Sequence, residues 1–127
     1  MILGVGIDLV PVARVDRMLN RHGERFLRRV FRPDECRKER GLLPAESLAA
    51  RVAAKEAAFK ALGTGWAGGV RWTDVEVVGG GGRAPALRLH GAARERALAC
   101  GVRRVHVSLT HQGGTAAAVV VLEGEAS

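Results

Sequence analysis

The sequence predicts an α+β fold of one domain, residues 1–127, in which a mainly antiparallel sheet packs on one long helix. Three observations support this fold class. Apolar and polar residues alternate in several short segments rich in valine, as strands require. An alanine-rich segment near the middle has the 3.6-residue period of a helix. Glycine-containing turns join neighbouring strands near 79–83 and 112–114, which indicates hairpins.

The composition limits the class of protein. Apolar residues make up 47% and charged residues 26% of the chain, which is typical of a soluble globular protein rather than a disordered one. No apolar run approaches the ~18 residues of a membrane span, and the start has no basic region and carries Asp8, unlike a signal peptide. Cys36 and Cys100 form no C-x-x-C pair, so we expect a reducing cytoplasm.

The first strand, residues 2–10, has two different faces. Leu3, Val5, Ile7 and Leu9 form an apolar face, whereas Gly4, Gly6 and Asp8 lie on the other. Glycines inside a strand often mark the close approach of a neighbour. We therefore expect the glycine face to receive the long helix, and we expect Asp8 to need a partner there.

The remaining elements follow in order. Pro11 favours a helix start after the first strand, Gly23 and Gly63 are suitable helix ends, and Pro33 suits the first position of a short helix. The expected elements are a helix 12–23, a short helix or turn 26–31, a short helix 33–41, a connector 41–46, the long helix from 46 or 47 to 62, strands 70–78 and 84–91 around a flexible turn 79–83, a helix 92–101, and strands 103–111 and 115–124.

The long helix has charged residues in informative places. Its apolar stripe consists of Leu48, Val52, Phe59 and Leu62. Lys55 falls within this stripe, so it must either extend its ammonium group to the surface or find an anion. Glu56 lies at the edge of the stripe, one turn before Lys60. A simple surface pair of Glu56 with Lys60 is one interpretation.

A magnesium site is the other interpretation. Asp8 and Glu56 are carboxylates on packed elements, and Mg²⁺ is usually bound by one or two carboxylates together with water and substrate phosphate. Gly63, Thr64 and Gly65 follow the helix, and glycines there would let backbone amides approach a phosphate. Near the C-terminus, strand alternation puts His106, Ser108 and Thr110 on one face, and His111 opens the turn. These groups could bind a phosphate or a base, or simply cap the turn.

Three segments in this order resemble the holo-[acyl-carrier-protein] synthases, the short class of 4′-phosphopantetheinyl transferases. They are GIDLVPVARV (6–15), RVAAKEAAFKALGTG (51–65) and HVSLTHQGGTAAAVVV (106–121), and the resemblance includes FRPDEC (31–36). It implies a cytoplasmic, Mg²⁺-dependent enzyme of fatty acid biosynthesis. This enzyme would transfer 4′-phosphopantetheine from coenzyme A to a serine of apo acyl carrier protein and release adenosine 3′,5′-bisphosphate.

The resemblance also implies roles for residues. Asp8 and Glu56 would bind the metal, Glu56 or a metal-bound water would take the serine proton, and Lys60 would stabilise the phosphates. A homotrimer with coenzyme A between subunits is expected. An acidic carrier protein would meet Arg14, with Arg21, Arg25 and Arg28 as further contacts. The expected contacts of coenzyme A are Arg51, Lys55, Gly63, Thr64, Gly65, Ser108, Thr110 and His111. Which of these residues meets the 3′-phosphate is left open.

Two alternatives stay open at this stage. The net charge of +7 also fits a basic nucleic-acid-binding module. Aromatic residues are only 4% of the chain and tyrosine is absent, which argues against such a module because aromatic stacking is common in it. The second alternative is an inactive relative, against which Asp8, Glu56 and Lys60 argue.

Overall fold

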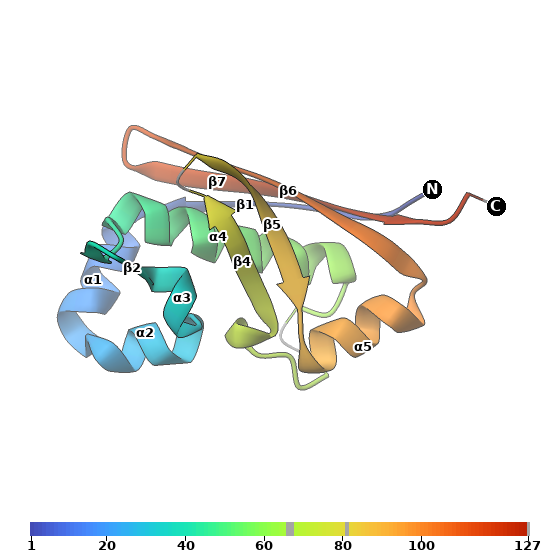
Figure 1. The fold of residues 1–127 in the computed structure, drawn as a ribbon, viewed down its shortest axis with the longest axis horizontal. Coiled ribbons are helices and arrows are strands. Elements are labelled where there is room, and N and C mark those ends of the chain that lie inside the picture. Colours follow the sequence, from blue (N-terminus) through green and yellow to red (C-terminus); the bar gives the residue numbers. More distant parts are fainter. Residues whose placement is uncertain (66–67, 81, 127) are drawn as a thin grey trace.

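The computed structural model describes residues 1–65, 68–80 and 82–126, and it confirms the α+β prediction (Figure 1). A three-stranded antiparallel sheet has the order β1–β7–β6, with β1 at Ile2–Pro11, β6 at Val102–Gln112 and β7 at Thr115–Gly124. Helix α4, Ala45–Leu62, lies along one face of this sheet (Figure 1).

Smaller elements surround α4 on the side away from the sheet. Helices α1 to α3 gather near the start of α4, and α5 lies toward its end (Figure 1). The antiparallel pair β4–β5 crosses α4 between these two groups (Figure 1). The bounds are α1 Val12–His22, α2 Glu24–Val30, α3 Pro33–Cys36, β2 Arg37–Lys38, β3 Gly41–Leu42, the 3₁₀ helix η1 Trp72–Asp74, β4 Val75–Gly80, β5 Arg83–Leu89 and α5 Gly91–Ala99.

The glycine face of β1 packs directly on α4, as the sequence predicts. A Cβ atom on Gly6 would lie less than 3.0 Å from the carbonyl oxygen of Ala57, and one on Gly4 would also lie less than 3.0 Å from the carbonyl oxygen of Ala61. Only glycine allows this approach of strand and helix, because any side chain would meet rigid backbone. Asp8 therefore lies next to the turn of α4 that carries Glu56 and Lys60.

The core is centred on α4, which is buried on almost every side. Phe59 and Leu48 are among its largest buried side chains, and the alanines of α4 let the surrounding elements approach closely. The predicted stripe of Leu48, Val52, Phe59 and Leu62 is confirmed.

Two predicted elements differ from the structure by more than two residues at one end. The helix expected over 33–41 ends at Cys36, and the chain continues as the small β2–β3 ribbon, where Gly41 has a positive φ of 98°. The strand expected from residue 70 begins at Val75, because Trp72–Asp74 forms a 3₁₀ turn whose start is capped by the Asp74 carboxylate. Gly81 of the expected turn 79–83, and Ser127, lie outside the described residues.

The outer face of β1 is apolar and exposed. Val5, Ile7 and Leu9 are 59%, 63% and 64% exposed on β1, which is an edge strand of the sheet. Among the described parts of the chain, no helix has the length and apolar character needed to cross a membrane.

Candidate functional site

Asp8 and Lys60 form one half of the candidate site. Asp8 projects from β1 toward α4, and its Oδ1 atom accepts a hydrogen bond of 2.8 Å from Lys60 Nζ. Lys60 also donates to the Ile7 carbonyl at 3.1 Å. Asp8 Oδ2 is buried and accepts no hydrogen bond from an N–H or hydroxyl group of the described residues. A buried carboxylate oxygen without a donor is costly, so this atom is suited to a cation.

Glu56 and Arg14 form the other half. Glu56 lies one turn before Lys60 on α4, and its Oε1 atom accepts a hydrogen bond of 3.2 Å from Arg14 on α1. The Glu56 side chain is 20% exposed and that of Arg14 is 47% exposed. The expected surface pair of Glu56 with Lys60 is therefore replaced by two cross-element pairs, Glu56 with Arg14 and Asp8 with Lys60.

The two carboxyl groups lie near enough to affect each other's pKa. Burial, the hydrogen bond with Asp8 and the Asp8 charge raise the pKa of Glu56 to about 7 from an ordinary 4.5, against the opposing effect of Arg14. Burial acts to raise the pKa of Asp8, but hydrogen bonds with Glu56 and Lys60 and the charges of Lys60 and Arg14 hold it below its usual value. Two carboxylates that resist joint ionisation are the arrangement a divalent cation relieves.

Lys55 does not reach this site. Its side chain is fully buried, and Nζ donates to Glu35 Oε1 at 2.9 Å, to the Trp72 carbonyl at 3.1 Å and to the Val75 carbonyl. Burial lowers the pKa of Lys55, and the Glu35 charge opposes this. Lys55 thus has the anion that its position in the stripe required, but that anion belongs to the protein. The structure does not support the coenzyme A contact expected for Lys55.

Arg51 is also buried, one turn before Lys55. Its guanidinium group donates to the Ser47 carbonyl at 3.2 Å, and its Nε atom has no hydrogen-bond partner among the described residues. Desolvation lowers the pKa of Arg51, and Glu35 partly compensates. The terminal nitrogen lies against Gly80 at the end of β4, so Arg51 faces the β4–β5 pair.

The segment Gly63–Gly65 ends α4. Gly63 has a left-handed φ of 74°, and the amides of Gly63 and Thr64 donate to the carbonyls of Lys60 and Phe59. These two amides are used by the helix end, so the expectation that they bind a phosphate does not fit this structure. Only the Gly65 amide of this segment, which has a φ of 53°, is left out of the helix cap.

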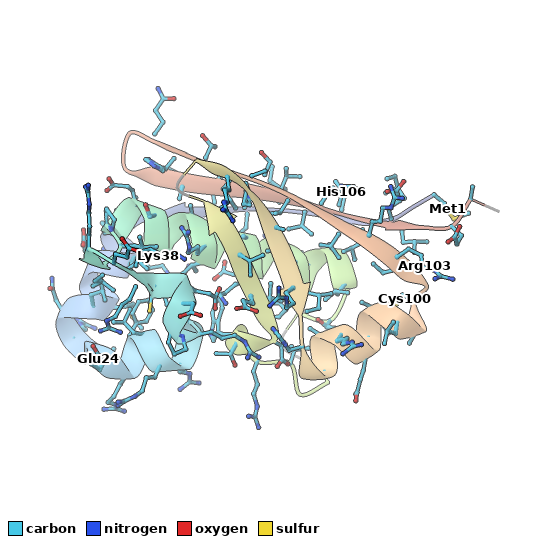
Figure 2. The ribbon with its side chains drawn as sticks, viewed as in Figure 1. Met1, Glu24, Lys38, Cys100, Arg103 and His106 are labelled. Atoms are coloured by element: carbon cyan, nitrogen blue, oxygen red, sulfur yellow. The ribbon has the colours of Figure 1, made fainter. Side chains whose placement is uncertain are left out.

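Ser108 and Thr110 lie on the outer face of the sheet. Ser108 is opposite Val119 and Thr110 is opposite Ala117, whereas Asp8 pairs with Ala118 and faces inward. His106 projects from the same outer face (Figure 2). Its Nε2 atom lies 2.9 Å from Glu123 Oε1. His111, at the end of β6, is exposed. One copy of the chain therefore cannot bring Ser108 and Thr110 to Asp8.

A basic surface surrounds Arg14. Arg21 on α1 and Arg25 and Arg28 on α2 are all exposed. A cavity of about 310 Å³ opens beside Arg14. Its lining joins arginine side chains to apolar ones, including Val15, Met18, Phe26, Val30 and Val52. The surface thus combines positive charge with an apolar recess, directly next to Glu56.

Sequence reasoning missed several contacts of the charged residues. Glu35 was not singled out, although it occupies the third position of the short helix after Pro33 and is the anion that Lys55 requires. The pairing of Arg14 with Glu56 was also missed, because the two residues are 42 positions apart and no local pattern joins them.

Comparisons with known proteins agree on one family. Residues 4–120 match the family model of the 4′-phosphopantetheinyl transferase superfamily. The chain is 53% identical over 132 residues to a holo-[acyl-carrier-protein] synthase of Anaeromyxobacter dehalogenans, covering 98% of both chains. It is 49% identical over 123 residues to that of Nitratidesulfovibrio vulgaris, covering 97% of this chain and 99% of the relative.

Solved structures are similar over the whole fold. The holo-[acyl-carrier-protein] synthase of Neisseria meningitidis has a TM-score of 0.85 at 32% identity, covering 97% of this chain and 99% of that one. The synthase of Helicobacter pylori, solved in complex with coenzyme A, has a TM-score of 0.79 at 30% identity, covering 94% of this chain and 99% of that one.

Proposed function

Because the chain belongs to the 4′-phosphopantetheinyl transferase superfamily and, within it, to the holo-[acyl-carrier-protein] synthases, we propose the corresponding transfer as its activity. The substrate is coenzyme A, the acceptor is a serine of apo acyl carrier protein, and the second product is adenosine 3′,5′-bisphosphate. Residues 1–127 act as one transferase domain, in the cytoplasm, and supply fatty acid biosynthesis. The juxtaposition of Asp8 and Glu56 at the end of a basic surface carries this proposal.

Magnesium is the proposed cofactor, and the residues present fit it. Asp8 Oδ2 is a buried oxygen without a donor, and the Asp8 charge acts on Glu56 by raising its pKa. Two carboxylates with water and substrate phosphates match the preference of Mg²⁺ for a small number of protein oxygens. When bound, the ion neutralises and orients the pyrophosphate of coenzyme A. No group of three or more acidic, histidine or cysteine ligands occurs among the residues that the structure describes.

The protein's own side chains are proposed to accept the serine proton and to stabilise the phosphates. Glu56 is the proposed acceptor of the serine proton, because it is a carboxylate at the candidate metal site beside Asp8. Lys60 is 57% exposed at its side chain, so its ammonium group can turn from Asp8 toward a phosphate and stabilise the leaving bisphosphate. Positioning and charge neutralisation supply most of the rate, because a carboxylate is a weak base for a serine hydroxyl.

A homotrimer with sites between subunits is part of the proposal. Val5, Ile7 and Leu9 form an exposed apolar face that a second copy would cover, since isolated proteins rarely leave such a face open. Ser108 and Thr110 share this outer face and would then face the neighbouring subunit, where together with His111 they could bind coenzyme A. Arg51 and Gly65 are the proposed contacts from the other subunit.

The acyl carrier protein is the proposed partner of the basic surface. Arg14, Arg21 and Arg28 are exposed there, and an acidic protein would pair with them. The recess beside Arg14 offers apolar contact to the same partner. The net charge of +7 is thus explained by an acidic protein partner, without a need for nucleic acid.

The test is direct. The protein is incubated with apo acyl carrier protein, coenzyme A and Mg²⁺, and mass spectrometry follows the addition of one phosphopantetheine to the serine. Glu56→Gln is expected to reduce turnover by ~100-fold or more, the size of losing one charge-stabilising group, with an unchanged circular dichroism spectrum. Absence of modification by the wild-type protein, or full turnover by Glu56→Gln at limiting Mg²⁺, would refute the proposal.

A further inference from the structure

Arg14 lies at the meeting point of two proposed functions. It is on the exposed basic surface of α1, and its side chain donates to Glu56 Oε1 at 3.2 Å. The neighbouring Asp8 has its own cation, since Lys60 lies 2.8 Å from Oδ1. In the ion-free protein, each carboxylate of the candidate metal site is therefore paired with a positive side chain of the protein itself.

The two positive side chains are not equivalent. Lys60 extends from α4, the helix that also carries Glu56, and its side chain is 57% exposed, so it is the proposed contact of the coenzyme A phosphates. Arg14 comes from α1 and lines the recess on the side of the carrier protein. In the proposed function, the ligand that brings negative charge to Arg14 is therefore the carrier protein.

We propose that Arg14 couples carrier-protein docking to metal binding, as a positioning residue that acts through Glu56. While Arg14 is paired with Glu56, its positive charge opposes a divalent cation at the same carboxylate. An acidic side chain of the carrier protein next to Arg14 neutralises this charge or draws the guanidinium group away. In both cases Glu56 becomes a better ligand, so the ion binds more tightly when the acceptor is present. This inference rests on the proposed function.

The coupling must be reciprocal. If the carrier protein raises the affinity for Mg²⁺ by some factor, Mg²⁺ raises the affinity for the carrier protein by the same factor. Coupling of this kind is usually about 5-fold to 150-fold. The enzyme would then complete its metal site chiefly when both substrates are in place, which limits the unproductive cleavage of coenzyme A by water.

Metal affinity, measured by calorimetry without turnover, tests the coupling. Mg²⁺ is titrated into the protein with coenzyme A, with and without an apo carrier protein whose acceptor serine is replaced by alanine. In the wild type, the carrier protein is expected to tighten Mg²⁺ binding at least about 5-fold. Arg14→Gln is expected to bind Mg²⁺ more tightly without the carrier protein and to gain little when it is added. Arg14→Lys, which keeps the charge, should retain part of the coupling.

A control on the same helix separates this effect from a general loss of charge. Arg17 is exposed on α1 and is hydrogen-bonded to no described side chain, so Arg17→Gln should show the wild-type coupling factor. The inference is refuted if Arg14→Gln leaves Mg²⁺ affinity and its response to the carrier protein unchanged. Glu56→Gln separates failure of the metal site from failure of the coupling. If Mg²⁺ binding persists in Glu56→Gln, the metal site of the proposed function is refuted. If Mg²⁺ binding is lost in Glu56→Gln but does not respond to substitution of Arg14, only the coupling is refuted.

Discussion

Replacing Lys55 by methionine is the sharpest test of the reassignment of this residue from ligand binding to the interior. The ammonium group of Lys55 is fully buried and donates to Glu35 and to the carbonyls of Trp72 and Val75. It also lies 5.6 Å from the centre of the Phe31 ring. Methionine fills a similar volume but leaves the carboxylate of Glu35, 1% exposed, without its counter-charge.

The expected cost follows from this burial. Removing one partner of a buried ion pair costs ~3–5 kcal/mol, because the remaining charge has no compensation. A domain of this size has a free energy of unfolding of about 5–15 kcal/mol. With a urea slope of about 2 kcal/mol/M, a loss of about 4 kcal/mol lowers the unfolding midpoint by roughly 2 M. The backbone amides of Arg32 and Val77 still donate to Glu35, so we expect the lower half of this range.

The assay is urea unfolding of Lys55→Met at a protein concentration matched to the wild type, because oligomer stability depends on concentration. The double variant Glu35→Gln with Lys55→Met removes both charges and should recover at least ~1 kcal/mol of the loss, as expected for a coupled pair. Coenzyme A affinity, measured on the folded fraction, should stay close to that of the wild type. If Lys55→Met instead keeps its unfolding midpoint and loses coenzyme A affinity, Lys55 is a ligand contact and the reasoning fails.

Three further expectations follow from the site and its supports. Gly6→Ala should destabilise the protein by about 3 kcal/mol or more, since the new Cβ meets the Ala57 carbonyl, and the thermal melting temperature measures this; an unchanged melting temperature would contradict the packing. In the ion-free protein, Glu56 has a pKa of about 7 when folded and about 4.5 when unfolded. Between these pH values the folded protein holds a proton that the unfolded chain has lost. The free energy of unfolding should therefore fall as the pH rises through this window, by at most ~3 kcal/mol. Urea midpoints in a chelator at several pH values test this, and Glu56→Gln should flatten the curve. Ile7→Asp, on the exposed sheet face, should convert the proposed trimer into monomers in light scattering and abolish activity, whereas a monomeric wild type would refute the trimer.

Much of the site could be predicted from short-range patterns. The alternation of β1 separates Gly4, Gly6 and Asp8 from the apolar residues, and a strand with a bare face accepts only a close neighbour. The helical period of α4 places Glu56 and Lys60 one turn apart at the edge of the buried stripe. Both patterns are local, and backbone geometry makes them reliable. They predict which faces meet, and therefore that Asp8 lies near Glu56.

The partners of the charged residues could not be predicted in the same way. The sequence requires an anion for Lys55, but the choice of Glu35 depends on how α3 packs against α4, 20 positions away. Similarly, helix spacing brings Glu56 close to Lys60, yet the structure pairs Glu56 with Arg14 and leaves Lys60 to Asp8. Each of these pairings joins residues on different elements, and such contacts are set by packing rather than by spacing along the chain.

The amino-acid sequence by itself determined the family, the order of most elements and the two carboxylates, because these depend on motifs and on periodicity within single elements. Only the tertiary structure decided that Lys55 is buried, that the Gly63 and Thr64 amides close the end of α4, and that Ser108 and Thr110 lie across the sheet from Asp8. The physical reason is that burial and hydrogen-bond partners depend on every element that packs around a residue, whereas the sequence near a residue fixes only the direction in which its side chain leaves the backbone.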